Sequence, residues 1–205
     1  MFDMLAEAGL DLVHPFDARA VARETSLALL DDPARPAGWL VGNTRALWPK
    51  FLAARAADPK LVQSAHPIQD YVEATLEAIA GARVLYSHRR YDGAFLPFQR
   101  VAVAAGLGTL AKSQLVIHPT YGPWFALRAI VLTDGTPDTR VLPAPACNCE
   151  VACDGAFARA LEATGPEAWR AWLAVRDACC VGREHRYSDE QIHYHYTKAF
   201  LTKAD

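Results

Sequence analysis

Long hydrophobic runs are missing from this sequence. None of the apolar stretches in its 205 residues is long enough to span a lipid bilayer. No positively charged N-terminal region followed by an apolar segment marks a secretory signal peptide. We therefore expect a cytoplasmic protein without a membrane partner.

A surplus of basic residues is also missing. The chain holds 21 Lys and Arg against 23 Asp and Glu, and its formal net charge at pH 7 is −2. A general nucleic-acid binder neutralises phosphates with clustered cations, and no such stripe occurs here. We expect no nucleic-acid partner, while the composition leaves a homodimer open.

Cysteine is absent from the first 146 residues. The odd number of cysteines and their late clustering suit a reducing compartment, and favour metal or redox chemistry over a disulfide scaffold. The spacing C-x-C-x3-C matches neither a zinc ribbon nor a bacterial iron–sulfur motif, although thiolates so spaced can share a soft cation. Buried or redox-active thiols are the alternative. The candidate metal ligands are Cys147, Cys149 and Cys153, and a later pair stands at Cys179 and Cys180.

A complete dinucleotide-binding fingerprint is absent as well. Gly106 and Gly108 bracket Leu107, but the later glycine and the following helix of that motif are missing, which excludes a Rossmann site. These glycines suit a positive φ angle or a close approach of the backbone instead.

The patterns that are present predict both helices and strands. Apolar residues at helical spacing and strand-like runs alternate along the chain. Proline-rich residues 143–145 mark a boundary between a core, 1–142, and a helical, cysteine-containing segment of the same domain, 143–205. The expected helices are 1–10, 18–30, 45–57, 68–80, 96–105, 156–163, 166–177 and 188–201, and the expected strands are 12–16, 38–42, 82–87, 115–117 and 124–132.

A single charge, Arg128, interrupts the long apolar strand 124–132. Leaving a cation buried without a partner costs several kcal/mol, on the order of what breaking a buried ion pair costs. Arg128 therefore pairs inside the protein, reaches solvent or lines a site for an anionic ligand. Similarly, the basic run at 88–90 either contacts a phosphate or carboxylate or forms a solvated loop.

Two separated segments resemble one known family. LVIHPTYGPWFALRAIVL, residues 115–132, looks like the core signature of the MMACHC (CblC) cobalamin-processing proteins, and RDACCVGREHRYSDEQ, residues 176–191, resembles a second segment of that family. The resemblance implies a nitroreductase-like α+β fold with a central, mainly antiparallel sheet flanked by helices. It also implies removal of the upper axial ligand of a base-off cobalamin, with glutathione or another thiol, or reduced flavin, as co-substrate.

The resemblance also assigns residues to roles. Arg128 and Arg176 match arginines implicated in holding the carboxylates of glutathione, and Tyr187 is a weaker candidate near the same site. A planar guanidinium suits carboxylate binding. The expected corrinoid-binding residues are Gly106, Leu107, Gly108, Ile117, His118, Pro119, Tyr121, Gly122, Trp124 and Phe125.

Residues 104–134 also resemble the corrinoid-binding part of epoxyqueuosine reductases. Alanine stands at position 111 where those enzymes have glycine, aspartate follows Cys153 where they have proline, and a second cysteine set of their spacing is missing. An iron–sulfur-assisted reductase of that type, needing at least four cysteines on a cluster, is one alternative. A non-catalytic corrinoid or metal carrier is the other.

Overall fold

The computed structural model describes residues 2–147 and 150–200, and its chain divides into two compact units. Unit 1 consists of residues 1–107 and 125–142, and unit 2 of residues 108–124 and 143–205. Segment 108–124 comes from inside the range expected for the core, so the sequence-based division at 142/143 stays a prediction. In the described residues, no helix has the length and apolar character needed to cross a bilayer.

Unit 1 is built on a four-stranded sheet in which every pair is antiparallel. Its strand order is β1-β2-β8-β3. The strands are β1 (Leu12–Asp17), β2 (Ala37–Asn43), β3 (Arg83–Tyr86) and β8 (Ala126–Thr133). This confirms the expected α+β class with a mainly antiparallel central sheet.

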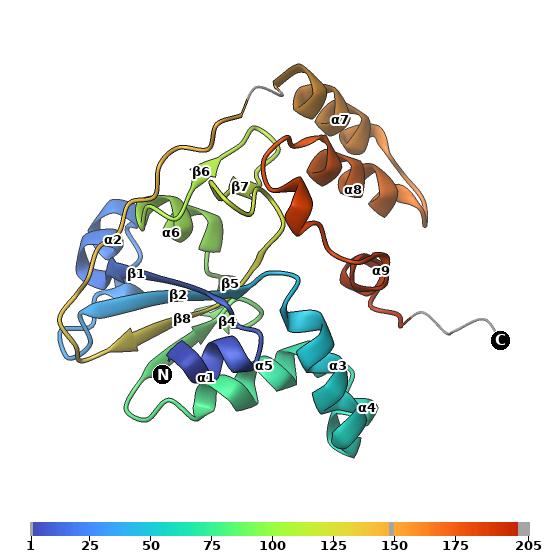
Figure 1. Cartoon of the computed structure of the whole chain (residues 1–205). Helices are drawn as coiled ribbons and strands as arrows, with labels where there is room; N and C mark the ends of the chain where they lie inside the picture. Colours follow the sequence, from blue (N-terminus) through green and yellow to red (C-terminus); the bar gives the residue numbers. More distant parts are fainter. Residues whose placement is uncertain (1, 148–149, 201–205) are drawn as a thin grey trace. The chain divides into compact units, whose positions relative to one another are not determined.

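Helices cover both faces of this sheet, which explains why β8 is apolar without alternation from Ala129 to Leu132. In Figure 1, α2 (Ala18–Thr25) and α6 (Phe98–Ala104) lie above the sheet, and α5 (Pro67–Glu77) lies below it. Ala129 to Leu132 are consecutively buried, because a strand covered on both faces has no solvent side. The remaining helices of unit 1 are α1 (Phe2–Glu7), the 3₁₀ turn η1 (Ala28–Leu30), α3 (Leu47–Ala57) and α4 (Pro59–Gln63).

The register of the sheet shifts once, beside Arg128. Val41 faces Ala129, but the next residue of β2, Gly42, faces Leu127, so Arg128 is the extra residue of a bulge on β8. A side chain on Gly42 would meet the Ala126 carbonyl oxygen at 2.5 Å, which explains the glycine. Bulges re-aim side chains, and this one sets Arg128 apart from the regular alternation of its strand.

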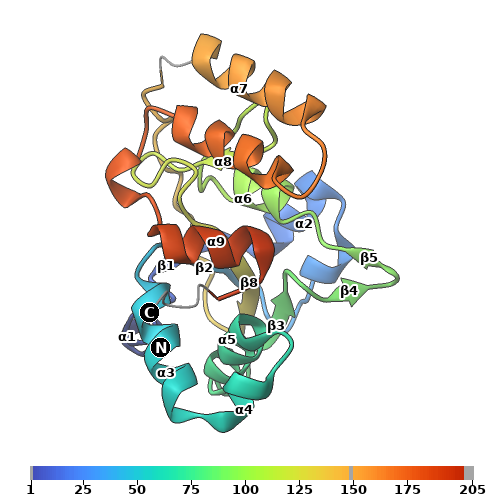
Figure 2. The same cartoon turned by 90° about the vertical axis from the view of Figure 1, so that its right-hand side faces the viewer.

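Unit 2 combines a short hairpin with three helices. The hairpin pairs β6 (Thr109–Leu110) with β7 (Val116–Ile117). Helices α7 (Glu150–Glu162) and α8 (Ala168–Ala178) run side by side and antiparallel, as Figures 1 and 2 both show, and their packing buries Ala156, Ala160 and Val175. The 3₁₀ turn η2 (Arg183–His185) leads to α9 (Asp189–Thr197).

Several expected boundaries were wrong. The helix expected over 18–30 ends at Thr25, because Ser26 adopts a left-handed conformation with φ of 59°. Helix α7 begins at Glu150 rather than at 156. Helix α4 and the hairpin of β4 (Arg90–Tyr91) and β5 (Ala94–Phe95) were not expected.

Candidate functional site

The residues assigned by the family resemblance fall in both units. Gly106, Leu107, Phe125 and Arg128 belong to unit 1. The other assigned residues that the structure describes belong to unit 2. Cys149 lies outside the described residues.

In unit 1, Arg128 is held by a neutral acceptor. Its Nε donates to Oδ1 of Asn43 at 2.6 Å, and the Asn43 amide in turn donates to the Thr44 carbonyl at 2.7 Å. Asn43 is fully buried, while Arg128 keeps some exposed surface. An internal partner, one of the three outcomes expected for Arg128, is therefore present, and it leaves the positive charge of the guanidinium unneutralised by Asn43.

The expected close backbone approach at Gly106 is made by the chain itself. Gly106 has φ of 75°, and an added Cβ would lie 3.0 Å from Cα of Val141. The Leu142 amide donates to the Gly106 carbonyl at 2.8 Å. Leu107 and Phe125 are buried core residues of this part of the chain.

The basic run that follows β3 is also paired. Arg89 binds both carboxylate oxygens of Glu73, and Nε2 of His88 lies 2.7 Å from Glu73 Oε1. Burial opposes ionisation of Glu73, but the hydrogen bonds from Arg89 and His88 outweigh it, so the pKa of this carboxyl is lowered. The contacts of Arg89 and His88 with Glu73 therefore stabilise a local structure of unit 1.

In unit 2, residues His118–Gly122 form a tight turn, which we call the signature turn. His118 and Gly122 exchange backbone hydrogen bonds at 3.0 and 2.9 Å. Nδ1 of His118 accepts from the amides of Thr120 and Tyr121, and the imidazole stacks on the Tyr121 ring with centroids 4.6 Å apart. Because Nδ1 is an acceptor, the proton of a neutral His118 is on Nε2.

The signature turn packs directly against Cys179–Gly182, which we call the CCVG segment. A Cβ on Gly122 would lie 1.9 Å from the Val181 carbonyl oxygen, and one on Gly182 would lie 2.2 Å from the carbonyl carbon of Tyr121. Both glycines also have positive φ angles, 54° and 70°. The two backbones thus touch at a contact that only glycine allows.

Arg176 and Tyr187 lie on either side of the CCVG segment in the sequence, and both reach residues that follow the signature turn. NH1 of Arg176 donates to the Pro123 carbonyl. Tyr187 packs edge-on against Trp124, with ring centroids 5.7 Å apart, in a small core with Ile192. The structure therefore brings residues 115–124 of the first segment together with the second segment, 176–191, within unit 2.

The buried state of the apolar candidates limits what they can contact. Trp124, Ile117 and His118 are less than 9% exposed, whereas Pro119 and Tyr121 keep more of their surface. The rings of Tyr121 and His185 pack edge to face, with their centroids 4.9 Å apart. The accessible part of the signature turn is thus its tip.

A cavity of about 260 Å³ lies inside unit 2, beside the hairpin and α8. Its lining includes Cys147, Cys153 and Cys179, together with Lys112, whose ammonium group pairs with Asp154 at 2.6 Å. Sγ of Cys180 lies 3.8 Å from Sγ of Cys147. Among residues 2–147 and 150–200, no three His, Cys, Asp or Glu side chains are placed to hold one metal ion.

Sequence reasoning missed three features of this unit: the partnership of Cys147 with Cys180, the Lys112–Asp154 pair and the role of Gly182. The vicinal cysteines at the end of α8 were the available signal for the first. Gly182 carried no readable signal, because its function depends on a contact between segments about sixty residues apart.

Comparison with known proteins gives one informative likeness. No protein-family model and no curated protein matches the chain. The B12-trafficking protein CblC of C. elegans, a homologue of human MMACHC, matches with a TM-score of 0.66 and 17% identity, over 94% of this chain and 87% of that one.

Epoxyqueuosine reductases match less well. One structure with a tRNA stem loop and another from Streptococcus thermophilus give TM-scores of 0.47 and 0.46, at 16% identity. The chain covers 66% of the length of each. This protein therefore has the nitroreductase-like α+β fold of the CblC protein.

Proposed function

We propose that this protein binds a cobalamin and removes its upper axial ligand. The observation that carries the proposal is the contact between the signature turn and the CCVG segment. Both lie in segments whose sequences resemble the cobalamin-processing family, and they meet in a chain with the fold of a B12-trafficking protein.

Cobalamin is the substrate in this proposal. With methylcobalamin, a thiolate attacks the methyl carbon, a thioether forms, and the electron pair of the cobalt–carbon bond stays on cobalt as Co(I). With cyanocobalamin, reduced flavin supplies the electrons that expel cyanide. The protein contributes base-off binding, exclusion of water and alignment of the thiol.

Arg128 and Arg176 are proposed to bind the carboxylates of an anionic thiol such as glutathione. Arg128 donates to Oδ1 of Asn43 and Arg176 donates to the Pro123 carbonyl. A planar guanidinium is suited to bidentate binding of a carboxylate. Pro119 and Tyr121, at the accessible tip of the signature turn, are proposed to contact the corrinoid.

The test is anaerobic turnover of methylcobalamin with glutathione, followed as S-methylglutathione by mass spectrometry. The native chain should produce it catalytically. Binding of methylcobalamin without product would support a carrier instead.

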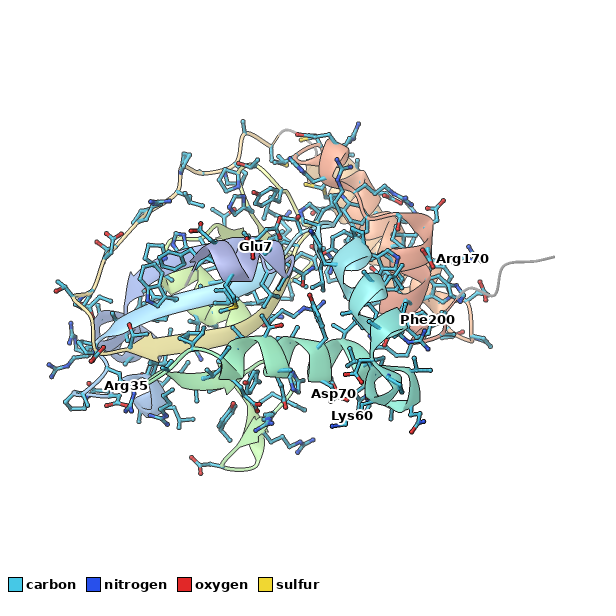
Figure 3. The ribbon with its side chains drawn as sticks, turned by 60° about the horizontal axis from the view of Figure 1, so that its bottom comes forward. Glu7, Arg35, Lys60, Asp70, Arg170 and Phe200 are labelled. Atoms are coloured by element: carbon cyan, nitrogen blue, oxygen red, sulfur yellow. The ribbon has the colours of Figure 1, made fainter. Side chains whose placement is uncertain are left out.

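Arg176→Ala should raise the KM for glutathione about tenfold or more, the loss expected for one charged hydrogen bond, while cobalamin affinity stays within about twofold. Arg170→Ala is the matched control on the same helix. Arg170 is exposed, pairs with Glu167 and extends outward from α8 in Figure 3. Equal loss of cobalamin and glutathione binding in Arg176→Ala would show that Arg176 only supports the fold.

Residues 2–147 and 150–200 contain no group of three His, Cys, Asp or Glu side chains placed to hold one metal ion. Cys149, one of the predicted ligands, lies outside these residues.

A further inference from the structure

The cysteines of unit 2 are not used by the proposed function, yet their arrangement is specific. Cys147 and Cys180 are 33 positions apart in the sequence, and their sulfur atoms are 3.8 Å apart. A disulfide bond needs about 2.05 Å, so a small movement of two side chains would join them.

The two thiols differ in accessibility. Cys147 is exposed, whereas Cys180, which follows the end of α8 by two residues, is partly buried. In thiol–disulfide exchange an accessible thiolate attacks first, and a second thiol then resolves the mixed disulfide. The exposure of the two side chains therefore makes Cys147 the attacking thiol and Cys180 the resolving thiol.

The neighbouring cavity determines which disulfides fit. Cys147 lines it, with the apolar side chains of Leu115, Ile117 and Val175 and the charged pair of Lys112 and Asp154. About 260 Å³ admits a substituent of a few heavy atoms, not a segment of folded protein.

We propose that Cys147 and Cys180 form a redox-active dithiol that reduces low-molecular-weight disulfides. The Cys147 thiolate attacks one sulfur of the substrate, which forms a mixed disulfide and releases one thiolate. Cys180, deprotonated by solvent, then attacks Sγ of Cys147, which releases the second thiolate and leaves a Cys147–Cys180 disulfide. The substrate gains two electrons, and the two cysteines lose them.

The experiment uses the reduced full chain and bis(2-hydroxyethyl) disulfide as the probe. Peptide mass spectrometry should find Cys147 linked to Cys180, with two equivalents of mercaptoethanol released per chain. Cys180→Ser should stop after one equivalent and retain the mercaptoethanol adduct on Cys147. Cys147→Ser should react at least about tenfold more slowly.

Cys153→Ser tests whether the crosslink is specific, because Cys153 also lines the cavity. This variant should still release two equivalents and form the Cys147–Cys180 disulfide. A Cys180→Ser protein that still releases two, or a crosslink between other cysteines, would overturn the proposal.

A soft metal is the competing occupant, because two thiolates on one zinc ion also lie a few ångströms apart. Stoichiometric zinc or iron in the purified chain, with thiols that react only after chelation, would also overturn the proposal. The result does not depend on cobalamin, so it stands or falls separately from the proposed function.

Discussion

At the scale of single residues, Gly122 and Gly182 carry the contact that joins the two signature segments. Each combines a positive φ with a distance that no Cβ tolerates. The first property costs an L-residue about 1–2 kcal/mol, and the second forces the backbones apart. The geometry of the signature turn therefore depends on the absence of two methyl groups.

We predict that Gly122→Ala and Gly182→Ala lower the free energy of unfolding by about 3 kcal/mol or more, because strain and steric overlap add. Gly165→Ala separates the two effects. It has φ of 83° but nothing within 4 Å of an added Cβ, so it should cost only about 1 kcal/mol. Urea unfolding monitored by circular dichroism measures all three, and equal losses would contradict the close contact.

His14 provides a pH-dependent prediction. Burial lowers its pKa below the ordinary value of 6.5, although the Ala105 carbonyl, which accepts from Nε2 at 2.8 Å, opposes the shift. Just below pH 6.5 the unfolded chain therefore binds a proton that the folded chain does not. Stability should fall as pH decreases from 6.5 toward the folded-state pKa.

His14→Gln tests this, because glutamine keeps an N–H donor but does not titrate. The slope of unfolding free energy against pH should be smaller in this variant over that window. An unchanged slope would show that His14 is not responsible.

The sequence predicted residue roles unevenly. The close backbone approach at Gly106 was predicted from a local pattern, and an internal partner was one of three outcomes left open for Arg128. The identity of that partner was not predicted, because Asn43 lies on another strand and the bulge at Arg128 depends on pairing between β2 and β8. Contacts between distant segments leave no local trace in the chain.

At the scale of elements, caps and breakers set the boundaries. Asp17 accepts from the Ala20 amide at 2.9 Å at the start of α2, and Ser188 accepts from the Gln191 amide at 3.2 Å at the start of α9. Aspartate and serine are both residue types favoured at the N-cap position. The end of α2 was predicted wrongly, because Ser26 adopts a left-handed conformation without the glycine that usually signals it.

Asp17→Ala should therefore reduce the free energy of unfolding by about 1 kcal/mol, since the Ala20 amide loses its acceptor. Asp17→Ser retains a capping oxygen and should lose less than half as much. Thermal or urea denaturation distinguishes them. If alanine and serine behave alike, the side-chain cap does not stabilise α2.

The start of helix α4 has a recognisable sequence pattern that the sequence analysis did not use. Asp58 accepts from the Lys60 amide at 2.8 Å, and Pro59 occupies the first helical turn. Aspartate followed by proline is a common start of a helix. The five-residue length of α4 provides too little periodicity to reveal it otherwise.

At the scale of the whole molecule, the α+β class and the mainly antiparallel sheet were predicted from the resemblance to the cobalamin-processing family, and the fold confirms both. The grouping of the chain into units did not, because residues 108–124 group with the C-terminal helices rather than with their sequence neighbours. The contact with the CCVG segment accounts for this grouping. The sequence motifs resembling one family thus identified two segments that the fold brings together.

The central claim is that this chain binds cobalamin in the base-off state, and an anaerobic absorbance titration with methylcobalamin tests it most directly. Protein in excess should shift the spectrum from the base-on to the base-off form, and glutathione should then remove the cobalt–carbon band. An unchanged base-on spectrum at clear excess of protein would contradict the claim, whatever the cysteines do.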